Sequence, residues 1–213
     1  MVEWRERLRT ALLREPDHRV EQWRLGGSES GVPEALRASL AQTLQPAAVL
    51  VPVVETRDAA SLLLTVRATH LRQHAGQISF PGGRANTADA DLLATALREA
   101  EEEVGLAREF VEPLGYLGDQ VVLTGYRITP VVARVREGFA LRVDENEVAQ
   151  HFLLPLTVLM DEGSFRLRTR QLRGIAVTGY ELQFQGHQIW GATAGILQRL
   201  REALREVPSG SAS

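Results

Sequence analysis

One segment, residues 92–104, constrains the fold of this chain more than any other part of its sequence. It carries the strongest helical pattern, and Gly105 follows it in the usual position of a left-handed C-cap. Ala94, Ala100 and Val104 are placed to pack one side of this helix against a sheet. The sequence therefore predicts a helix that lies on the face of a β-sheet.

The same helix is rich in carboxylates. Glu99, Glu102 and Glu103 stand at i, i+3 and i+4, so they share one face, whereas Glu101 points elsewhere. Three crowded carboxylates repel one another, and hard oxygen ligands of this kind favour Mg²⁺ or Mn²⁺. The alternative is a solvated acidic surface with glutamate–arginine pairs, and Arg98 can reach Glu102, four residues further on.

Strands are predicted before and after this helix. Valine and leucine dominate residues 47–55 and 61–68, which predict two strands joined by a polar turn, and a glycine-bearing segment, residues 74–91, leads into the helix. Further downstream, the pattern predicts strands over 125–135 and 148–156, a hairpin near 180–190 and a last helix over 192–206. Helices and strands alternate without a regular βαβ period. We therefore expect an α/β fold with a mixed sheet and helices on both faces.

The first 45 residues predict a helical N-terminal extension. Apolar residues recur there at helical spacing in two stretches, Trp4, Leu8 and Leu12, and then Leu36, Leu40 and Leu44. Pro33 suits the first turn of the second helix, and residues 26–31 are expected to form a flexible connector between the two. We divide the chain into this extension at 1–45, a main domain at 46–207 and a flexible tail at 208–213.

Composition excludes several kinds of chemistry. The 213 residues include no cysteine, which rules out a cysteine nucleophile, a thiolate zinc site and a disulfide framework. All 24 basic residues are arginine, so no Walker lysine or Schiff-base lysine exists. Any anionic ligand must be bound by arginine, histidine, backbone amides or a metal ion.

Charge and hydropathy bear on partners and location. A net charge of −3 argues against a nucleic-acid partner. The charged N-terminus lacks the apolar run of a signal peptide, and no stretch approaches the roughly 18 to 20 apolar residues that span a bilayer. We therefore expect a cytoplasmic protein without a membrane partner.

The acidic helix and the turn before it resemble the Nudix box, G-x5-E-x7-R-E-U-x-E-E-x-G-U, in which U is aliphatic or small. The matching positions are Arg98, Glu99, Ala100, Glu102, Glu103, Gly105 and Leu106. Arg98 lies 15 positions after Gly83, one more than the pattern allows. The loop is therefore one residue longer, with Asp89 or Asp91 in the place of the outer glutamate.

Residues 63–83 resemble a second motif, which marks the coenzyme A pyrophosphatase branch of the Nudix family: L-L-T-x-R-S-x-x-L-R-x-H-x-G-x-x-x-F-P-G-G. The matches are Leu63, Leu64, Thr65, Arg67, Leu71, Arg72, His74, Gly76 and residues 80–83, and Ala68 replaces the serine. That branch also carries the longer box. Residues 189–197 are similar to its closing helix.

The resemblance implies a Nudix-type α/β/α sandwich with a central mixed sheet. It also implies a Mg²⁺- or Mn²⁺-dependent pyrophosphohydrolase that splits coenzyme A, or its derivatives, into 3′,5′-ADP and 4′-phosphopantetheine. The implied metal ligands are Glu99, Glu102 and Glu103, and the implied catalytic groups are Arg98, Glu102, Glu103 and Glu147, with Glu145 as an alternative to Glu147. The general base stays open among these glutamates. The implied substrate-binding residues are Arg67, Arg72, His74, Phe80, Gly82 and Gly83.

Arg67, Arg72 and His74 also suggest phosphate binding without the family. They place positive charge beside the acidic helix, and coenzyme A carries a 3′-phosphate in addition to its pyrophosphate. The alternative for the two arginines is solvation or pairing with the glutamates, and for His74 an ordinary polar position in a loop.

Other functions remain open at this point. One is hydrolysis of another nucleoside diphosphate derivative, such as ADP-ribose or NADH, although no S-Q-P-W-P-F-like segment for NADH follows the box. A second is a ligand-binding Nudix module without turnover, which the intact box glutamates argue against. The apolar N-terminal helices also suggest a homodimer.

Overall fold

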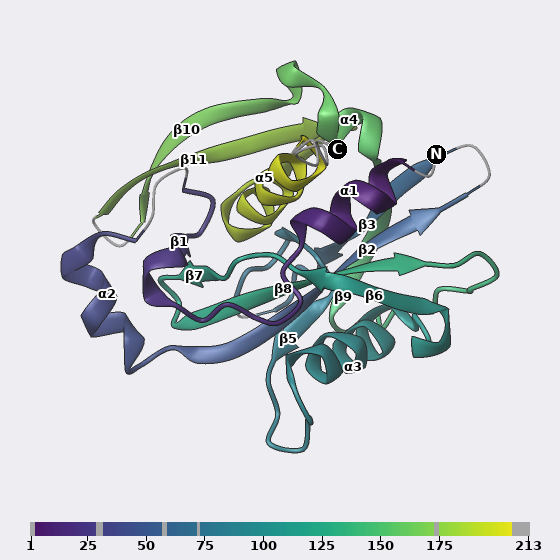
Figure 1. Ribbon diagram of the computed structural model, residues 1–213, viewed down its shortest axis with the longest axis horizontal. Helices are drawn as coiled ribbons and strands as arrows, with labels where there is room; N and C mark the ends of the chain where they lie inside the picture. The colour runs from purple at the N-terminus through teal and green to yellow at the C-terminus, as the bar shows by residue number, and fades with distance from the viewer. Residues whose placement is uncertain (1–2, 29–31, 57–58, 72, 173–174, 206–213) are drawn as a thin grey trace, which may run out of the picture.

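The computed structural model describes residues 3–28, 32–56, 59–71, 73–172 and 175–205 (Figure 1). Its helices are α1 (Glu3–Ala11), α2 (Glu34–Ala41), α3 (Leu92–Val104), α4 (Leu156–Met160) and α5 (Gly191–Arg205), with short 3-10 turns at Val20–Gln22, Arg108–Phe110 and Glu162–Ser164. Its strands are β1 (Arg24–Leu25), β2 (Gln45–Glu55), β3 (Ala60–Arg67), β4 (Ile78–Ser79), β5 (Gly82–Arg84), β6 (Val111–Tyr116), β7 (Gln120–Val122), β8 (Tyr126–Val135), β9 (Val148–Pro155), β10 (Phe165–Leu172), β11 (Ile175–Phe184) and β12 (His187–Ile189). In the part of the chain so described, no helix is long and apolar enough to cross a membrane.

The central sheet has nine strands and is mixed, as predicted. Its main path runs β1-β7-β8-β2-β3-β4, while β5 pairs with β2, β6 with β8 and β9 with β3. The β2–β8 and β1–β7 pairs are parallel and the others are antiparallel. Parallel strands at the centre of a sheet are covered on both faces. This explains why the apolar run of β2 is almost continuous rather than alternating.

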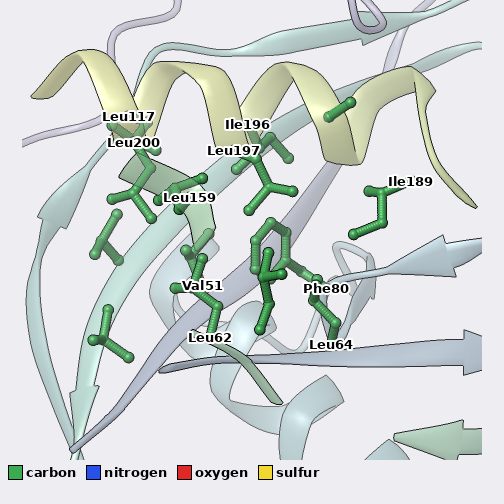
Figure 2. Close-up of a cluster of buried hydrophobic side chains, with 14 of the residues drawn as sticks. Val51, Leu62, Leu64, Phe80, Leu117, Leu159, Ile189, Ile196, Leu197 and Leu200 are labelled. Carbon is green, nitrogen blue, oxygen red and sulfur yellow. The ribbon is translucent and has the colours of Figure 1, made fainter. Parts of the chain in front are cut away.

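Helices cover both faces of this sheet, so the α/β/α arrangement is confirmed (Figure 1). On one face, α3 packs its buried residues on β2, β3 and β8. Ala100 and Val104 are fully buried as predicted, whereas Ala94 is only partly buried and Ala96 occupies the core instead. On the other face, α5 contributes Ile196, Leu197 and Leu200 to a second core (Figure 2).

The N-terminal residues share this second core. Leu8 of α1 is completely buried in the cluster to which α5 contributes, and Arg5 forms an ion pair with Glu55 at the end of β2. Both predicted helices are present, but Pro33 lies just before α2 rather than in its first turn. β1 also pairs with β7 at the edge of the central sheet.

The predicted flexible connector at 26–31 is wrong for its first residues; residues 29–31 lie outside the described part. Gly26 and Gly27 pack tightly against other backbone segments: a Cβ on Gly27 would lie 2.5 Å from the carbonyl oxygen of Gly191, and one on Gly195 would lie 2.6 Å from that of Gly26. Ser28 is buried as well. Glycine permits this close approach because it has no side chain.

A second sheet of three antiparallel strands, β10-β11-β12, packs over α5 (Figure 1). The predicted hairpin is confirmed between β11 and β12, with Gln185 and Gly186 both at positive φ, 48° and 84°, as a type I′ turn requires. Our sequence analysis missed β10. Its arginines alternate with leucine and threonine, so it lacks the apolar face that marks a strand.

Candidate active site

Caps at both ends fix the position of α3. The Asp91 side chain accepts a hydrogen bond of 2.7 Å from the backbone N–H of Ala94. Gly105 ends the helix in the left-handed region, at φ 68°, as predicted. Fixed ends determine which way each glutamate of the helix points.

The three glutamates of the predicted shared face have unequal surroundings. The side chain of Glu102 is 59% exposed, that of Glu99 15% and that of Glu103 only 3%. Glu103 accepts a hydrogen bond of 3.2 Å from the backbone N–H of Gly82, and its other oxygen lies 3.6 Å from Nη1 of Arg67. Burial raises the pKa of Glu103 to about 8, despite the opposing effect of the Gly82 hydrogen bond and the Arg67 charge.

Glu99 lies directly against Gly83, which together with Gly82 makes up the glycine turn that the structure places at the start of strand β5. A Cβ on Gly83 would be 2.5 Å from the carboxylate carbon of Glu99, so only glycine leaves room for this side chain. Burial raises the pKa of Glu99, and the negative charges of Glu102 and Glu147 add to that rise. The carboxylates therefore repel one another in a partly dehydrated place.

Arg98 holds this cluster together. It donates two hydrogen bonds of 2.9 Å to the carboxylate of Asp89, one of 2.8 Å to Glu99 and one of 3.0 Å to Glu102. Asp89, not Asp91, therefore takes the place of the outer carboxylate, and the bonds from Arg98 hold the pKa of Asp89 well below its usual range. Because its guanidinium is committed to these carboxylates, we interpret Arg98 as a positioning residue.

The loop that carries Glu147 is attached to the end of α3. The backbone N–H of Arg142 bonds to the carbonyl of Val104 at 2.8 Å, and that of Asp144 bonds to Glu103 at 3.0 Å. The carbonyl of Glu147 accepts a bond of 2.9 Å from Ala68, after β3. The exposed Glu147 carboxylate is close enough to raise the pKa values of two box glutamates, Glu99 and Glu103. The structure thus brings this predicted residue to the site.

Among the residues described, no three carboxylates or imidazoles converge as a ready-made metal cluster. The carboxylate of Glu103 turns to Gly82, while those of Glu99 and Glu102 turn to Arg98. The donor set nevertheless suits a hard divalent cation, because it consists of oxygen ligands that repel one another when ionised. Glu99, Glu102 and Glu103 are the residues that would hold it.

A cleft of about 520 Å³ lies beside the glycine turn. Gly82 and Gly83 form part of its wall and also contact Glu103 and Glu99, so one turn separates the cleft from the acidic helix. Its lining includes apolar residues, for example Val49, together with several polar and aromatic groups. A volume in this range is typical of small-molecule sites.

Most predicted substrate-binding residues line this cleft, namely Arg67, His74, Phe80, Gly82 and Gly83. His74 has a positive φ of 58° and its Nδ1 lies 2.9 Å from the side-chain oxygen of Gln77. Phe80 is only 2% exposed and belongs to the α5 core, so it supports the wall rather than presenting a surface (Figure 2). Arg72 lies outside the described residues.

The sequence analysis assigned no role to several other residues that line the cleft. Among them are Arg84, Tyr126, Gln171 and Trp190, together with the first residues of α5. Trp190 and the start of α5 belong to the segment at 189–197 that resembles the closing helix of the branch. Arg84, Tyr126 and Gln171 belong to three different strands, β5, β8 and β10, which only the fold brings together.

Comparison with known proteins agrees with this site. The model of the NUDIX domain matches residues 44–172. A protein named Nudix hydrolase NudL from Cronobacter sakazakii is 41% identical over 176 residues, which cover 83% of this chain and 90% of the relative. A NudL from Salmonella paratyphi B is 42% identical over 154 residues, covering 72% and 80%. The chain therefore belongs to the Nudix family. It is a Nudix hydrolase, a pyrophosphatase that acts on phosphoric anhydrides.

A solved structure supports the fold. The Nudix hydrolase RenU from M. smegmatis superimposes with a TM-score of 0.51 at 21% identity, over 77% of this chain and 88% of that one. Nudix hydrolases generally use divalent metal cations, which agrees with the donor set on α3. The names of the NudL relatives specify no substrate.

Proposed function

We propose that this enzyme is a Mg²⁺- or Mn²⁺-dependent pyrophosphohydrolase that cleaves coenzyme A, or its derivatives, into 3′,5′-ADP and 4′-phosphopantetheine. One observation carries the proposal: the Gly82–Gly83 turn is shared between the acidic helix and the cleft. A pyrophosphate at this turn would face the carboxylates of Glu99 and Glu103 on one side. The rest of the substrate would lie in the cleft on the other.

Each group of residues in the site would have a separate role. Glu99, Glu102 and Glu103 would hold the cation, which neutralises the pyrophosphate charge and lowers the pKa of water when bound. Arg98 would keep Glu99 and Glu102 in place, and Asp89 would keep Arg98 in place. Arg67 is at once in the cleft wall and 3.6 Å from Glu103, so it can contact a phosphate oxygen beside the turn.

Glu147 is our preferred general base. Glu102 accepts a bond from Arg98 and Glu103 accepts one from Gly82, so both carboxylates are partly committed. Glu147 is exposed and its loop is anchored beside them. It would accept a proton from a water whose oxygen forms a bond to one phosphorus, while the bond from that phosphorus to the bridging oxygen breaks and the other phosphate leaves with the electron pair.

Coenzyme A is favoured over other nucleoside diphosphate derivatives by the motif at 63–83 and by the arginines that it contains. Arg67 lines the cleft with His74, and Arg72 remains a predicted contact. ADP-ribose and NADH, which share the pyrophosphate but lack the 3′-phosphate, are the alternatives to be tested.

A substrate panel tests the proposal. Coenzyme A, dephospho-coenzyme A, ADP-ribose and NADH would be incubated with Mg²⁺, with Mn²⁺ and with a chelator, and products identified by mass spectrometry. We expect the highest kcat/KM for coenzyme A, no turnover with chelator, and loss of most activity in Glu103→Gln with the fold retained. A clear preference for ADP-ribose or NADH would contradict the coenzyme A assignment, and near-normal turnover by Glu103→Gln would contradict the metal assignment.

A homodimer and a cytoplasmic location also stay predictions. α1 buries Leu8 in its own core, but Leu13, just after it, is 38% exposed and remains available to a second copy. Light scattering would give the oligomeric state, and cell fractionation the location.

A further inference from the structure

A second group of positive charges lies beside the cleft, near Trp190 and Gly191. Trp190 and Gly191 line the main cleft and also a smaller cavity of about 40 Å³ next to it. Arg168 and Arg170 of β10 line this smaller cavity. Its volume would hold two or three water molecules, roughly the size of one phosphate group.

The two arginines differ in their partners. Arg170 forms an ion pair with the buried Glu181, and its guanidinium lies 4.8 Å from the centre of the Trp190 ring. Arg168 lacks a hydrogen bond or ion pair with the described residues, although its charge also acts on Glu181 from beyond ion-pair distance. Arg170 is therefore the direct partner of Glu181, and the guanidinium donors of Arg168 can bind a ligand.

The cavity walls favour a compact anion. Four glycines, Gly26, Gly27, Gly179 and Gly191, contribute backbone without side chains, and Gly27 and Gly179 pack directly against each other. Trp190 adds a flat aromatic surface beside the cation. Indole surfaces stack well on nucleobases, and an arginine next to them provides a charged donor for phosphate.

We propose that Arg168 binds the phosphomonoester on the nucleoside part of the substrate, with the nucleobase against Trp190. This inference rests on the proposed function and specifies which arm of the substrate occupies the cleft. The pantetheine arm is uncharged and has no aromatic ring, so it would gain nothing from Arg168. Arg67, beside Glu103, is then close to the pyrophosphate, and Arg168 adds a contact for the 3′-phosphate.

Binding of nucleotides in the absence of metal tests this directly. The probes are 3′,5′-ADP and 5′-AMP, which differ only in the 3′-phosphate, and calorimetry gives both Kd values. We expect 3′,5′-ADP to bind about ten- to a hundredfold more tightly, the usual effect of one charge-assisted contact. Arg168→Gln should abolish this difference and leave the affinity for 5′-AMP unchanged.

Arg166→Gln is the matched control. Arg166 lies two residues earlier on the same face of β10 but lines neither cavity, so its replacement should preserve the difference. Both nucleotides should also quench tryptophan fluorescence, and Trp190→Phe should remove that signal although Trp4 and Trp23 remain.

The outcomes are distinct. Equal Kd values in the unmodified enzyme, or a difference that survives Arg168→Gln, would overturn the phosphate site, and quenching that survives Trp190→Phe would overturn the base position. Neither readout involves turnover. Failure of the coenzyme A assignment would instead appear in the substrate panel, as cleavage of another compound.

Discussion

Replacing Gly83 by alanine should separate the catalytic role of the glycine turn from its structural role. The new Cβ would lie 2.5 Å from the carboxylate carbon of Glu99, about 1 Å closer than ordinary van der Waals contact allows. The end of a glutamate side chain can move aside at little cost in stability. It cannot do so and also keep the position that Arg98 gives it.

The expected magnitude follows from that displacement. A misplacement of about 1 Å in an active site can cost roughly a hundredfold in rate. We therefore expect Gly83→Ala to lower kcat about a hundredfold at saturating cation. The free energy of unfolding should change by less than about 1 kcal/mol, or some 2–4 °C in Tm.

A control at another glycine makes the result decisive. Gly186 has a φ of 84° in the β11–β12 turn, and a Cβ there would meet nothing within 4 Å. Gly186→Ala should lose about 1–2 kcal/mol through left-handed backbone strain but keep its kcat. Steady-state kinetics and thermal melting of both variants give the comparison. If Gly83→Ala turns over at close to the normal rate, then the contact between the glycine turn and Glu99 does not position a catalytic group.

Three further variants examine the support of the site and of the fold. Asp89→Asn should raise the cation concentration needed for half-maximal activity about 10- to 100-fold, because it releases the positioning arginine. Asp91→Ala should cost only about 1 kcal/mol of stability, because the helix loses its N-cap. Equal cation requirements in the two variants would refute the different roles of these aspartates. Glu147→Gln should lower kcat about 10²- to 10⁴-fold with little change in the cation requirement. Glu145→Gln should leave kcat unchanged. The reverse result would make Glu145 the general base instead of Glu147. Glu55→Gln should lose about 2 kcal/mol at pH 7, measured by urea unfolding, because Arg5 and Arg134 both lose this carboxylate, although Arg134 keeps its ion pair with Glu112. Burial works against the charged form of Glu55, but these arginines lower its folded pKa below 4.5. Its stabilisation is therefore present above pH 4.5 and is lost as the pH falls through the folded pKa. A difference between variant and parent that does not shrink as the pH is lowered from 4.5 would contradict this account.

Local signals in the sequence were enough to predict much of this protein. α3 could be placed because helical periodicity and a terminal glycine are read over a few neighbouring residues, and Gly105 does end it. The long strands β2, β3, β8 and β9 each span eight residues or more, and segments rich in apolar residues predicted them. The Nudix box is equally local, since its arginine and glutamates lie on one helix.

The structure alone decided how these residues differ from one another. Helical spacing places Glu99, Glu102 and Glu103 near one another, but it does not say which of them the sheet will cover. Glu103 is buried beside the start of β5, where the backbone N–H of Gly82 donates a hydrogen bond to it, while Glu102 faces water. Likewise, the sequence left both Asp89 and Asp91 as candidates for the place of the outer glutamate, and the path of the loop brings Asp89 to Arg98.

Contacts between distant parts of the chain could not be predicted from the sequence. Glu147 reaches the site only because its loop bonds to the end of α3, and Arg168 lines the same cavity as Trp190 only because β10 folds back along β11. Hydrophobic periodicity predicts the secondary structure of a segment from residues that are only a few positions apart. Which segments meet depends on the total burial and hydrogen bonding of the folded chain, a property that no single segment contains.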